Sequence, residues 1–62
     1  MEKLVYDRKA AAEALDISLP TLDEYINRPY RPIPIFRVGR QIKIPVDTLR
    51  EWVREETNHS LG

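Results

Sequence analysis

The sequence predicts a small α+β domain in which two helices, a two-stranded β-hairpin and a C-terminal helix follow one another along the chain. Residues 8–15 and 18–28 show the apolar spacing of helices, with an interruption at 16–18. Two short runs of β-branched and aromatic residues then flank a turn that contains Gly39. Helical spacing returns after Pro45, which completes the predicted order of elements.

Length and composition are those of one small domain without a cofactor. A chain of 62 residues buries only about 60% of its unfolded surface, so its core must be compact. We expect order from about residue 4 to residue 56 and a flexible tail at 57–62. Cysteine is absent and the single histidine, His59, has no second ligand nearby, so we expect neither a disulfide nor a metal site. Apolar runs are too short to span a membrane, and we expect a soluble cytoplasmic protein.

Charge is distributed unevenly along a chain whose ten basic and ten acidic residues cancel. The segment 25–46 carries a charge of +5 because it has no acidic residue and five basic ones: Arg28, Arg31, Arg37, Arg40 and Lys43. This predicts one cationic face on an otherwise acidic body, and nucleic-acid affinity depends on such a local patch more than on the total charge. The alternative is a solvated basic loop without a partner.

The N-terminal part of the chain predicts a lead-in strand and a first helix. Residues 1–6 contain enough apolar side chains for a short strand that could cover the edge of a sheet. Asp7 is placed to cap a helix over 8–15, which is rich in alanine. The apolar stripe of this helix is narrow and consists of Ala11, Ala14 and Leu15.

A second helix is predicted to begin at Ser18, whose hydroxyl is its N-cap, and to end before Pro29. Its apolar face consists of Leu22, Tyr25 and Ile26. Two helices joined by about three residues, with the apolar Ile17 inside the turn, fit the helix-turn-helix pattern. Any hairpin of two helices in a small bundle can produce the same pattern.

Four polar residues of this second helix and its end are candidates for contact with phosphates or base edges: Ser18, Thr21, Asn27 and Arg28. The alternative interpretation makes them helix caps and solvated surface. Asp23 and Glu24 oppose binding to a polyanion. Because Glu24 and Arg28 are four residues apart on a helix, we expect them to form a surface ion pair.

The hairpin follows a connector at 29–34, which we expect to be stiff and extended because three of its six residues are proline. A three-residue loop at 39–41 would pair Val38 with Ile42 and Phe36 with Ile44, so that all four face inward. Since register follows the buried face, we predict this loop or an equivalent bulge, although the common three-residue loop prefers its left-handed residue last. The outward polar residues would then be Arg37, Arg40, Gln41 and Lys43, with Arg37 opposite Lys43.

The third helix is predicted over residues 46–56, after Pro45 ends the second strand. Its apolar stripe consists of Val46, Leu49, Trp52 and Val53. Trp52 is the largest apolar side chain, so we expect it at the centre of the core, closing over Phe36, Ile44 and the helix-turn-helix.

This order of helix, turn, helix, basic hairpin and helix resembles the winged helix-turn-helix domain of the excisionase family, within the wider MerR-like superfamily. The resemblance covers Tyr6 to about Arg54. It depends on Ala11-Ala12 and Leu15, on the turn at 16–18 leading to Thr21-Leu22, on the segment 36–45, and on Leu49 and Trp52.

The resemblance implies a recognition helix that enters the major groove and a wing that reaches an adjacent minor groove or the backbone. Members of the family act as recombination directionality factors that bend attachment-site DNA and contact an integrase, or as small transcriptional regulators. Thr21, Asn27 and Arg28 would belong to the recognition helix, and Arg37, Arg40, Gln41 and Lys43 to the wing. Relatives often carry basic residues on the second helix, whereas this chain has Leu19, Pro20, Asp23 and Glu24 there. The wing is therefore expected to carry more of the DNA contact.

We do not expect an enzyme, because the chain has no cysteine, no paired histidines and no glycine-rich phosphate loop. The function that the sequence favours is an excisionase, an architectural protein that binds double-stranded DNA with sequence selectivity and directs an integrase toward excision. Self-association on adjacent DNA sites is a further expectation. The alternatives are a small transcriptional regulator of a phage or mobile element, and a protein-interaction module that uses the acidic surface of the third helix, at Glu51, Glu55 and Glu56.

Overall fold

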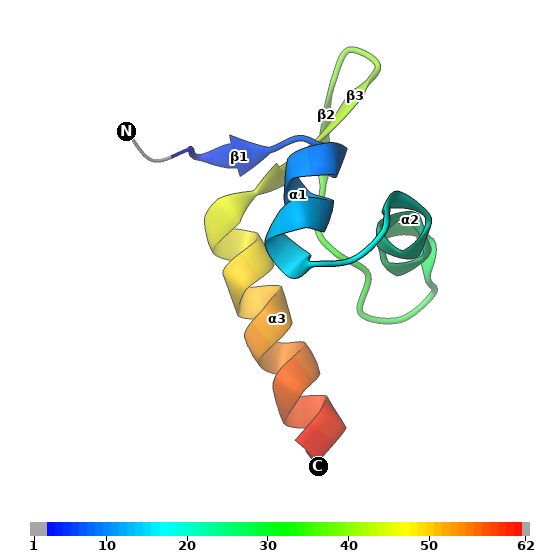
Figure 1. The fold of residues 1–62 in the computed structure, drawn as a ribbon, viewed down its shortest axis with the longest axis vertical. Coiled ribbons are helices and arrows are strands. Elements are labelled where there is room, and N and C mark those ends of the chain that lie inside the picture. Colours follow the sequence, from blue (N-terminus) through cyan, green and yellow to red (C-terminus); the bar gives the residue numbers. More distant parts are fainter. Residues whose placement is uncertain (1–2, 62) are drawn as a thin grey trace.

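The computed structural model describes residues 3–61, which form three helices and a three-stranded antiparallel sheet. The elements are β1 (Val5–Tyr6), α1 (Arg8–Leu15), α2 (Leu19–Asn27), β2 (Phe36–Val38), β3 (Gln41–Pro45) and α3 (Val46–Leu61) (Figure 1). This confirms the predicted α+β class and the predicted order of elements. The predicted lead-in and tail extend to Met1, Glu2 and Gly62, which lie outside the described residues.

α1 begins and ends through hydrogen bonds made by residues that flank it. The Asp7 carboxylate accepts a hydrogen bond of 2.7 Å from the Ala10 N–H, as predicted for an N-cap. Asp16 ends the helix in the left-handed conformation, with φ 58°, and the Ile17 N–H donates back to the Ala12 carbonyl at 3.0 Å. The chain thereby turns sharply, and Ile17 packs against the core from inside the turn.

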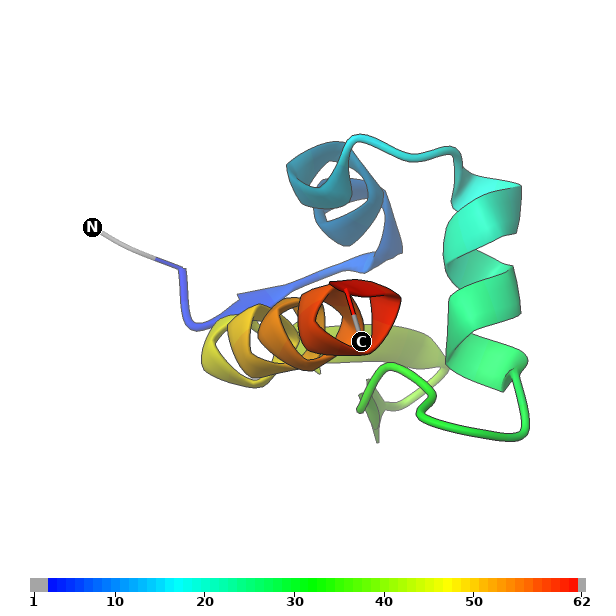
Figure 2. The same cartoon turned by 90° about the horizontal axis from the view of Figure 1, so that it is seen from below.

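α2 begins one residue after the predicted cap and runs across the direction of α1 (Figure 2). The Ser18 hydroxyl accepts from the Thr21 N–H at 3.3 Å, and Pro20 occupies the first turn, where its missing N–H has no cost. Leu22 is fully buried, while Tyr25 and Ile26 pack against the core only in part. The predicted helix and its apolar face are confirmed.

β3 is the central strand of the sheet. β1 pairs with it through Val5↔Pro45 and Tyr6↔Ile44, so the lead-in strand does cover a sheet edge, as predicted. β2 pairs with the other side of β3 through Phe36↔Lys43, Arg37↔Ile42 and Val38↔Gln41.

The predicted three-residue loop is wrong, because Gly39 and Arg40 alone connect β2 to β3. Gly39 has φ 61° and Arg40 has no positive φ, which is the pattern of a type II′ turn with glycine at its first central position. The hairpin projects beyond the helices, so no core lies against its tip and burial does not select the register there (Figure 1). Turn chemistry decides it instead.

The observed register also corrects which side chains of the hairpin face inward. Cross-strand partners share one face of a sheet, so Arg37 lies on the same face as Ile42 and not opposite Lys43. Ile44 is fully buried and Ile42 packs against the core, whereas Phe36 and Val38 are 44% and 55% exposed.

The connector at 29–34 is not extended throughout, which corrects the prediction for this segment. Arg31 has φ 46°, in the left-handed region, and the chain reverses there. The reversal brings Ile33 into the core, where it is 2% exposed and its N–H donates to the Tyr25 carbonyl at 3.2 Å. Two prolines flank a core residue here and limit its alternative conformations.

The core centres on Leu22, Ile33 and Ile44, not on Trp52. These three residues are joined by the buried Ala11, Ala12 and Leu49. Trp52 packs against this cluster from its edge and makes an edge-on contact with Tyr25, with ring centroids 5.4 Å apart. It does not close over Phe36, which is exposed.

α3 continues to Leu61 and so includes residues 57–61 of the predicted tail. Its C-terminal half extends away from the sheet (Figure 1). The Thr57 hydroxyl donates to the Val53 carbonyl at 2.9 Å within this half.

Candidate nucleic-acid interface

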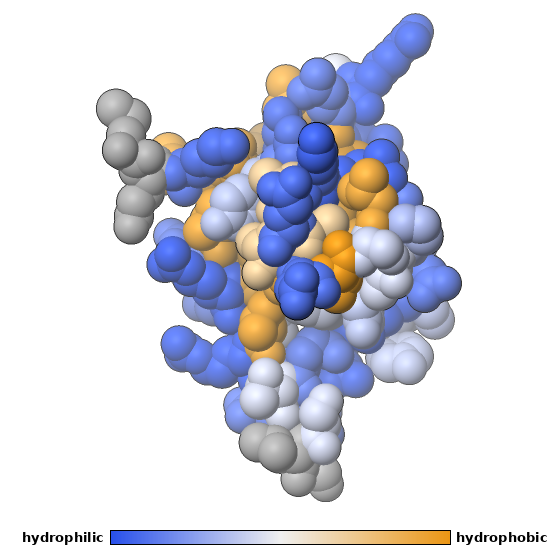
Figure 3. Space-filling model, in the orientation of Figure 1, coloured by the Kyte–Doolittle hydropathy of each residue, from blue (hydrophilic) through white to orange (hydrophobic). Residues whose placement is uncertain are grey.

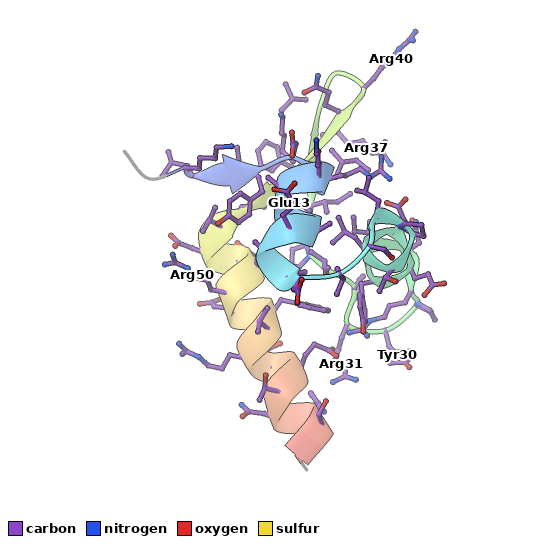
Figure 4. The ribbon with its side chains drawn as sticks, in the orientation of Figure 1. Glu13, Tyr30, Arg31, Arg37, Arg40 and Arg50 are labelled. Atoms are coloured by element: carbon purple, nitrogen blue, oxygen red, sulfur yellow. The ribbon has the colours of Figure 1, made fainter. Side chains whose placement is uncertain are left out.

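The hairpin presents the four polar residues predicted for the wing. Arg37 comes from β2, Arg40 from the turn, and Gln41 and Lys43 from β3. Arg40 extends away from the tip, and Arg37 lies on the side of the hairpin nearer to α2 (Figure 4). Lys43 is half-buried and the other three are exposed. Arg37 and Ile42 share the inner face, while Gln41 and Lys43 share the outer face with Phe36 and Val38.

The three cations of the hairpin have no ion-pair partner among residues 3–61. Ion pairs in this part of the chain join Arg8 to Asp23, and Arg28 and Arg31 to Glu56. Two of the five basic residues in the segment 25–46 are therefore paired within the protein. The unpaired positive charge of the segment is concentrated on the hairpin, at Arg37, Arg40 and Lys43.

A groove separates the hairpin tip from the first turn of α1, and Lys9, which lines it, is a fourth cation beside the hairpin. Its lining residues are Asp7, Arg8, Lys9, Arg40, Gln41 and Ile42. Lys9 is exposed, and Arg8 is held by Asp23. From helical spacing, Lys9 is predicted to lie outside the apolar stripe of α1, but its position beside the hairpin is not predicted. The pairing of β1 with β3 is what brings the start of α1 beside the hairpin.

One carboxylate lies among these cations. The hydrogen bond from the Ala10 N–H holds the pKa of Asp7 below its ordinary value, and the charges of Lys43, Lys3 and Lys9 act in the same direction. Asp7 is thus ionised at neutral pH and offsets part of the positive charge at the base of the hairpin.

The polar residues predicted on α2 are engaged in capping this helix. The Ser18 hydroxyl donates to the Thr21 hydroxyl at 2.9 Å and accepts from the Thr21 N–H. At the other end, the Asn27 side-chain amide donates to the Asp23 carbonyl at 2.9 Å. The structure brings Ser18 and Thr21 together at the N-terminus of α2, and it leaves Asn27 exposed at the C-terminus.

Asp23, which opposes contact with a polyanion, is neutralised by a cation from α1. Arg8 donates to its two carboxylate oxygens at 2.9 Å and 2.5 Å. Both side chains of this pair are about 40% exposed, at 41% and 40%, so the pair contributes roughly 0–1 kcal/mol to stability. Glu24 remains exposed, and the expected Glu24–Arg28 ion pair does not form, because Arg28 turns to Glu56 of α3.

Arg28 lies inside a cluster of aromatic rings and is only 16% exposed. Its guanidinium carbon is 5.0 Å, 5.4 Å and 5.3 Å from the ring centroids of Tyr25, Tyr30 and Trp52. The guanidinium also forms an ion pair with Glu56. Arg28 therefore joins the end of α2 to α3, and little of its side chain reaches the surface.

The Arg31 carbonyl is the second centre of this cluster. It accepts hydrogen bonds from Arg28 Nε at 3.0 Å, from Arg28 Nη2 at 2.7 Å and from the Trp52 indole N–H at 2.9 Å. The Arg31 side chain extends toward α3, where its Nη1 lies 3.7 Å from Glu56 Oε1 (Figure 4). Sequence reasoning misses Glu56 and the indole N–H, because 28 and 21 residues separate these groups from their partners.

Searches against protein-family models, curated proteins and solved structures find no match to this chain. Within residues 3–61, no three side chains of the kinds that bind metals gather in one place. None of the helices in this range has the length and apolar character needed to cross a membrane.

Proposed function

We propose that this chain is a winged helix-turn-helix protein that binds double-stranded DNA mainly through its hairpin. The observation that carries the proposal is the concentration of Arg37, Arg40 and Lys43 on one projecting hairpin, without ion-pair partners among residues 3–61. Cations in such a position neutralise phosphates and release counterions, which supplies most of the affinity of a small DNA-binding module. Lys9 extends the same surface onto α1.

In this proposal α2 contributes less than the hairpin. The hydroxyls of Ser18 and Thr21 at its N-terminus bond to each other, and the Ser18 hydroxyl caps the helix. Arg28, the basic residue at its C-terminus, is enclosed by aromatic rings. Neutralisation of Asp23 by Arg8 nevertheless lowers the repulsion between α2 and a phosphate backbone. The helix then positions the domain on the duplex, and Asn27 lies exposed at its C-terminal end with its side-chain nitrogen bonded to the Asp23 carbonyl.

We place the protein among the excisionases, on the resemblance of its sequence to that family. In this role it bends attachment-site DNA and associates with an integrase, and neighbouring copies bind cooperatively. The second candidate is a small transcriptional regulator with the same DNA-binding domain. An excision assay with an integrase encoded beside this chain separates the two, because a regulator leaves the ratio of excision to integration unchanged.

Gel-shift titration tests DNA binding itself. Duplexes selected by the protein from a random pool are compared with shuffled duplexes of the same composition. We expect measurable binding to both and tighter binding to the selected duplexes, since base contacts add to a phosphate term that is common to all sequences. A selection that enriches no duplex, together with undetectable binding to the random pool at low salt, would remove the proposal.

A further inference from the structure

The outer face of the hairpin combines two exposed apolar side chains with two polar ones. We define this outer wing face as Phe36, Val38, Gln41 and Lys43. Phe36 lies opposite Lys43 and Val38 lies opposite Gln41, so the register places all four on one side of the sheet. Phe36 and Val38 are 44% and 55% exposed, and they are neighbours on β2, two residues apart.

The fold itself does not bury this face. The opposite face of the hairpin already supplies the core with Ile42 and Ile44, and Ile44 is fully buried. A single exposed apolar residue needs no explanation, but Phe36 and Val38 form a small apolar strip on a strand that the structure leaves at the sheet edge. Hydrophobic residues also reach the surface between α1 and α3, on a different part of the molecule (Figure 3).

The charges around the strip define what it can bind. The strip is bordered by Lys43 on β3 and by Arg40 at the turn, and no acidic residue occurs between Tyr25 and Val46. The one carboxylate near these cations, Asp7, interacts with Lys43 and offsets only part of the charge. A DNA strand offers the matching surface, because apolar faces of deoxyribose rings and base edges alternate with phosphates along it. An acidic protein surface matches the cations but offers no such regular alternation.

Pairing with a second copy through the edge strand is disfavoured by the strand itself. β2 has only three residues, and it is bounded by the Gly39 turn on one side. Pro34, two residues before it, has no N–H to donate to an added strand. Short edge strands next to proline are a known protection against such pairing.

We propose that the outer wing face binds the sugar and base edges of duplex DNA through Phe36 and Val38, while Lys43 contacts a neighbouring phosphate. This inference rests on the proposed DNA-binding function and adds to it an apolar contribution that salt does not screen. Counterion release depends on the number of phosphate contacts, and apolar contact does not change that number. The two kinds of contact are therefore separable by experiment.

The test measures the dissociation constant by fluorescence anisotropy on a labelled random-sequence duplex over a series of salt concentrations. We expect Phe36→Ser and Val38→Ser each to weaken binding by about tenfold at every salt concentration, without changing the slope of log affinity against log salt. Lys43→Ala should lower that slope by about 1. Val53→Ser is the matched control, since Val53 is 38% exposed on α3, and it should leave binding unchanged.

Val38→Thr keeps the shape and the strand preference of valine and replaces the serine variants if circular dichroism shows that they do not fold. If the wild type binds DNA and no folded variant of Phe36 or Val38 binds more weakly, the inference is overturned and the proposed function still stands. A changed salt slope in Phe36→Ser or Val38→Thr would also overturn it, because the contact would then be electrostatic. A wild-type dimer in sedimentation that Val38→Thr disrupts, with DNA binding intact, would assign the face to a second copy. Absence of wild-type DNA binding would refute both proposals.

Discussion

Replacing Arg28 tests whether the cluster of Arg28, Glu56 and the aromatic rings stabilises the domain. Arg28→Ala removes contacts to three rings, each worth about 0.5–1 kcal/mol for a partly exposed cation. It also leaves the Glu56 carboxylate, whose side chain is 23% exposed, without its closest cation, which adds about 1 kcal/mol or more. We expect a total loss of roughly 2.5–4 kcal/mol.

Such a loss is large for a chain of this length. Stability scales at about 0.05–0.15 kcal/mol per residue, so a domain of this size has only ~3–9 kcal/mol in all. The melting temperature should fall by roughly 10–25 °C. Arg28→Lys should fall between the wild type and Arg28→Ala, because lysine keeps the charge but cannot donate in the planar geometry of a guanidinium.

Urea unfolding followed by circular dichroism gives the free energy, and it avoids the Trp52 fluorescence that the substitution itself would disturb. Arg8→Ala is the matched control, because it breaks an ion pair whose side chains are 41% and 40% exposed and should cost at most about 1 kcal/mol. If Arg28→Ala destabilises the domain no more than Arg8→Ala does, the cluster is a surface feature and our account of it is wrong.

Three further substitutions test separate parts of the fold by thermal or urea unfolding. Gly39→Ala should cost about 1–2 kcal/mol from its left-handed φ of 61° alone, since nothing lies within 4 Å of the added Cβ, and unchanged stability would contradict the turn. Ile33→Ala should lower the free energy of unfolding by about 2–4 kcal/mol, because Ile33 is buried. Leu4→Ala is the exposed control, and a smaller loss in Ile33→Ala than in this control would place Ile33 outside the core. Folding lowers the pKa of Asp7, so its contribution is present above about pH 4 and disappears as the pH falls through the lower folded value. Asp7→Asn should therefore reduce the acid dependence of the melting temperature, and an unchanged pH profile would exclude this contribution.

The helix caps could be predicted from the sequence because each depends on residues that are close in the chain. Asp7 and Ser18 each bond to an N–H three residues later, so the spacing alone determines the contact. The same holds for the order of the elements. The exposure of Arg37, Arg40 and Gln41 is also predictable, since these residues lie in or beside the turn of a hairpin that projects from the domain.

The hairpin register could not be predicted by the alternation of apolar residues. That rule requires a core on one side of the strands, and the part of the hairpin near Val38 has none. The preference of Gly39 for the first position of a two-residue turn is the stronger effect there. The glycine was the informative residue, and the apolar pattern of β2 marks an exposed strip.

The environment of Arg28 depends on contacts that no local pattern contains. Helical spacing suggests Glu24 as its partner, but the aromatic rings of Tyr25 and Trp52 offer a less exposed position beside Glu56. Residues 28 positions apart meet only after the connector has reversed at Arg31. This reversal needs a non-glycine residue in the left-handed region, which the sequence does not announce.

The most direct test of the central claim is the salt dependence of DNA binding in a variant with Arg37, Arg40 and Lys43 all replaced by alanine. The control replaces Arg50 and Arg54 of α3, which are exposed elsewhere on the molecule, as Figure 4 shows for Arg50. We expect the slope of log affinity against log salt to fall by about 3 in the hairpin variant and to stay unchanged in the control. Equal slopes in the wild type and the hairpin variant, with both proteins folded, would contradict the claim that the hairpin supplies the DNA contact.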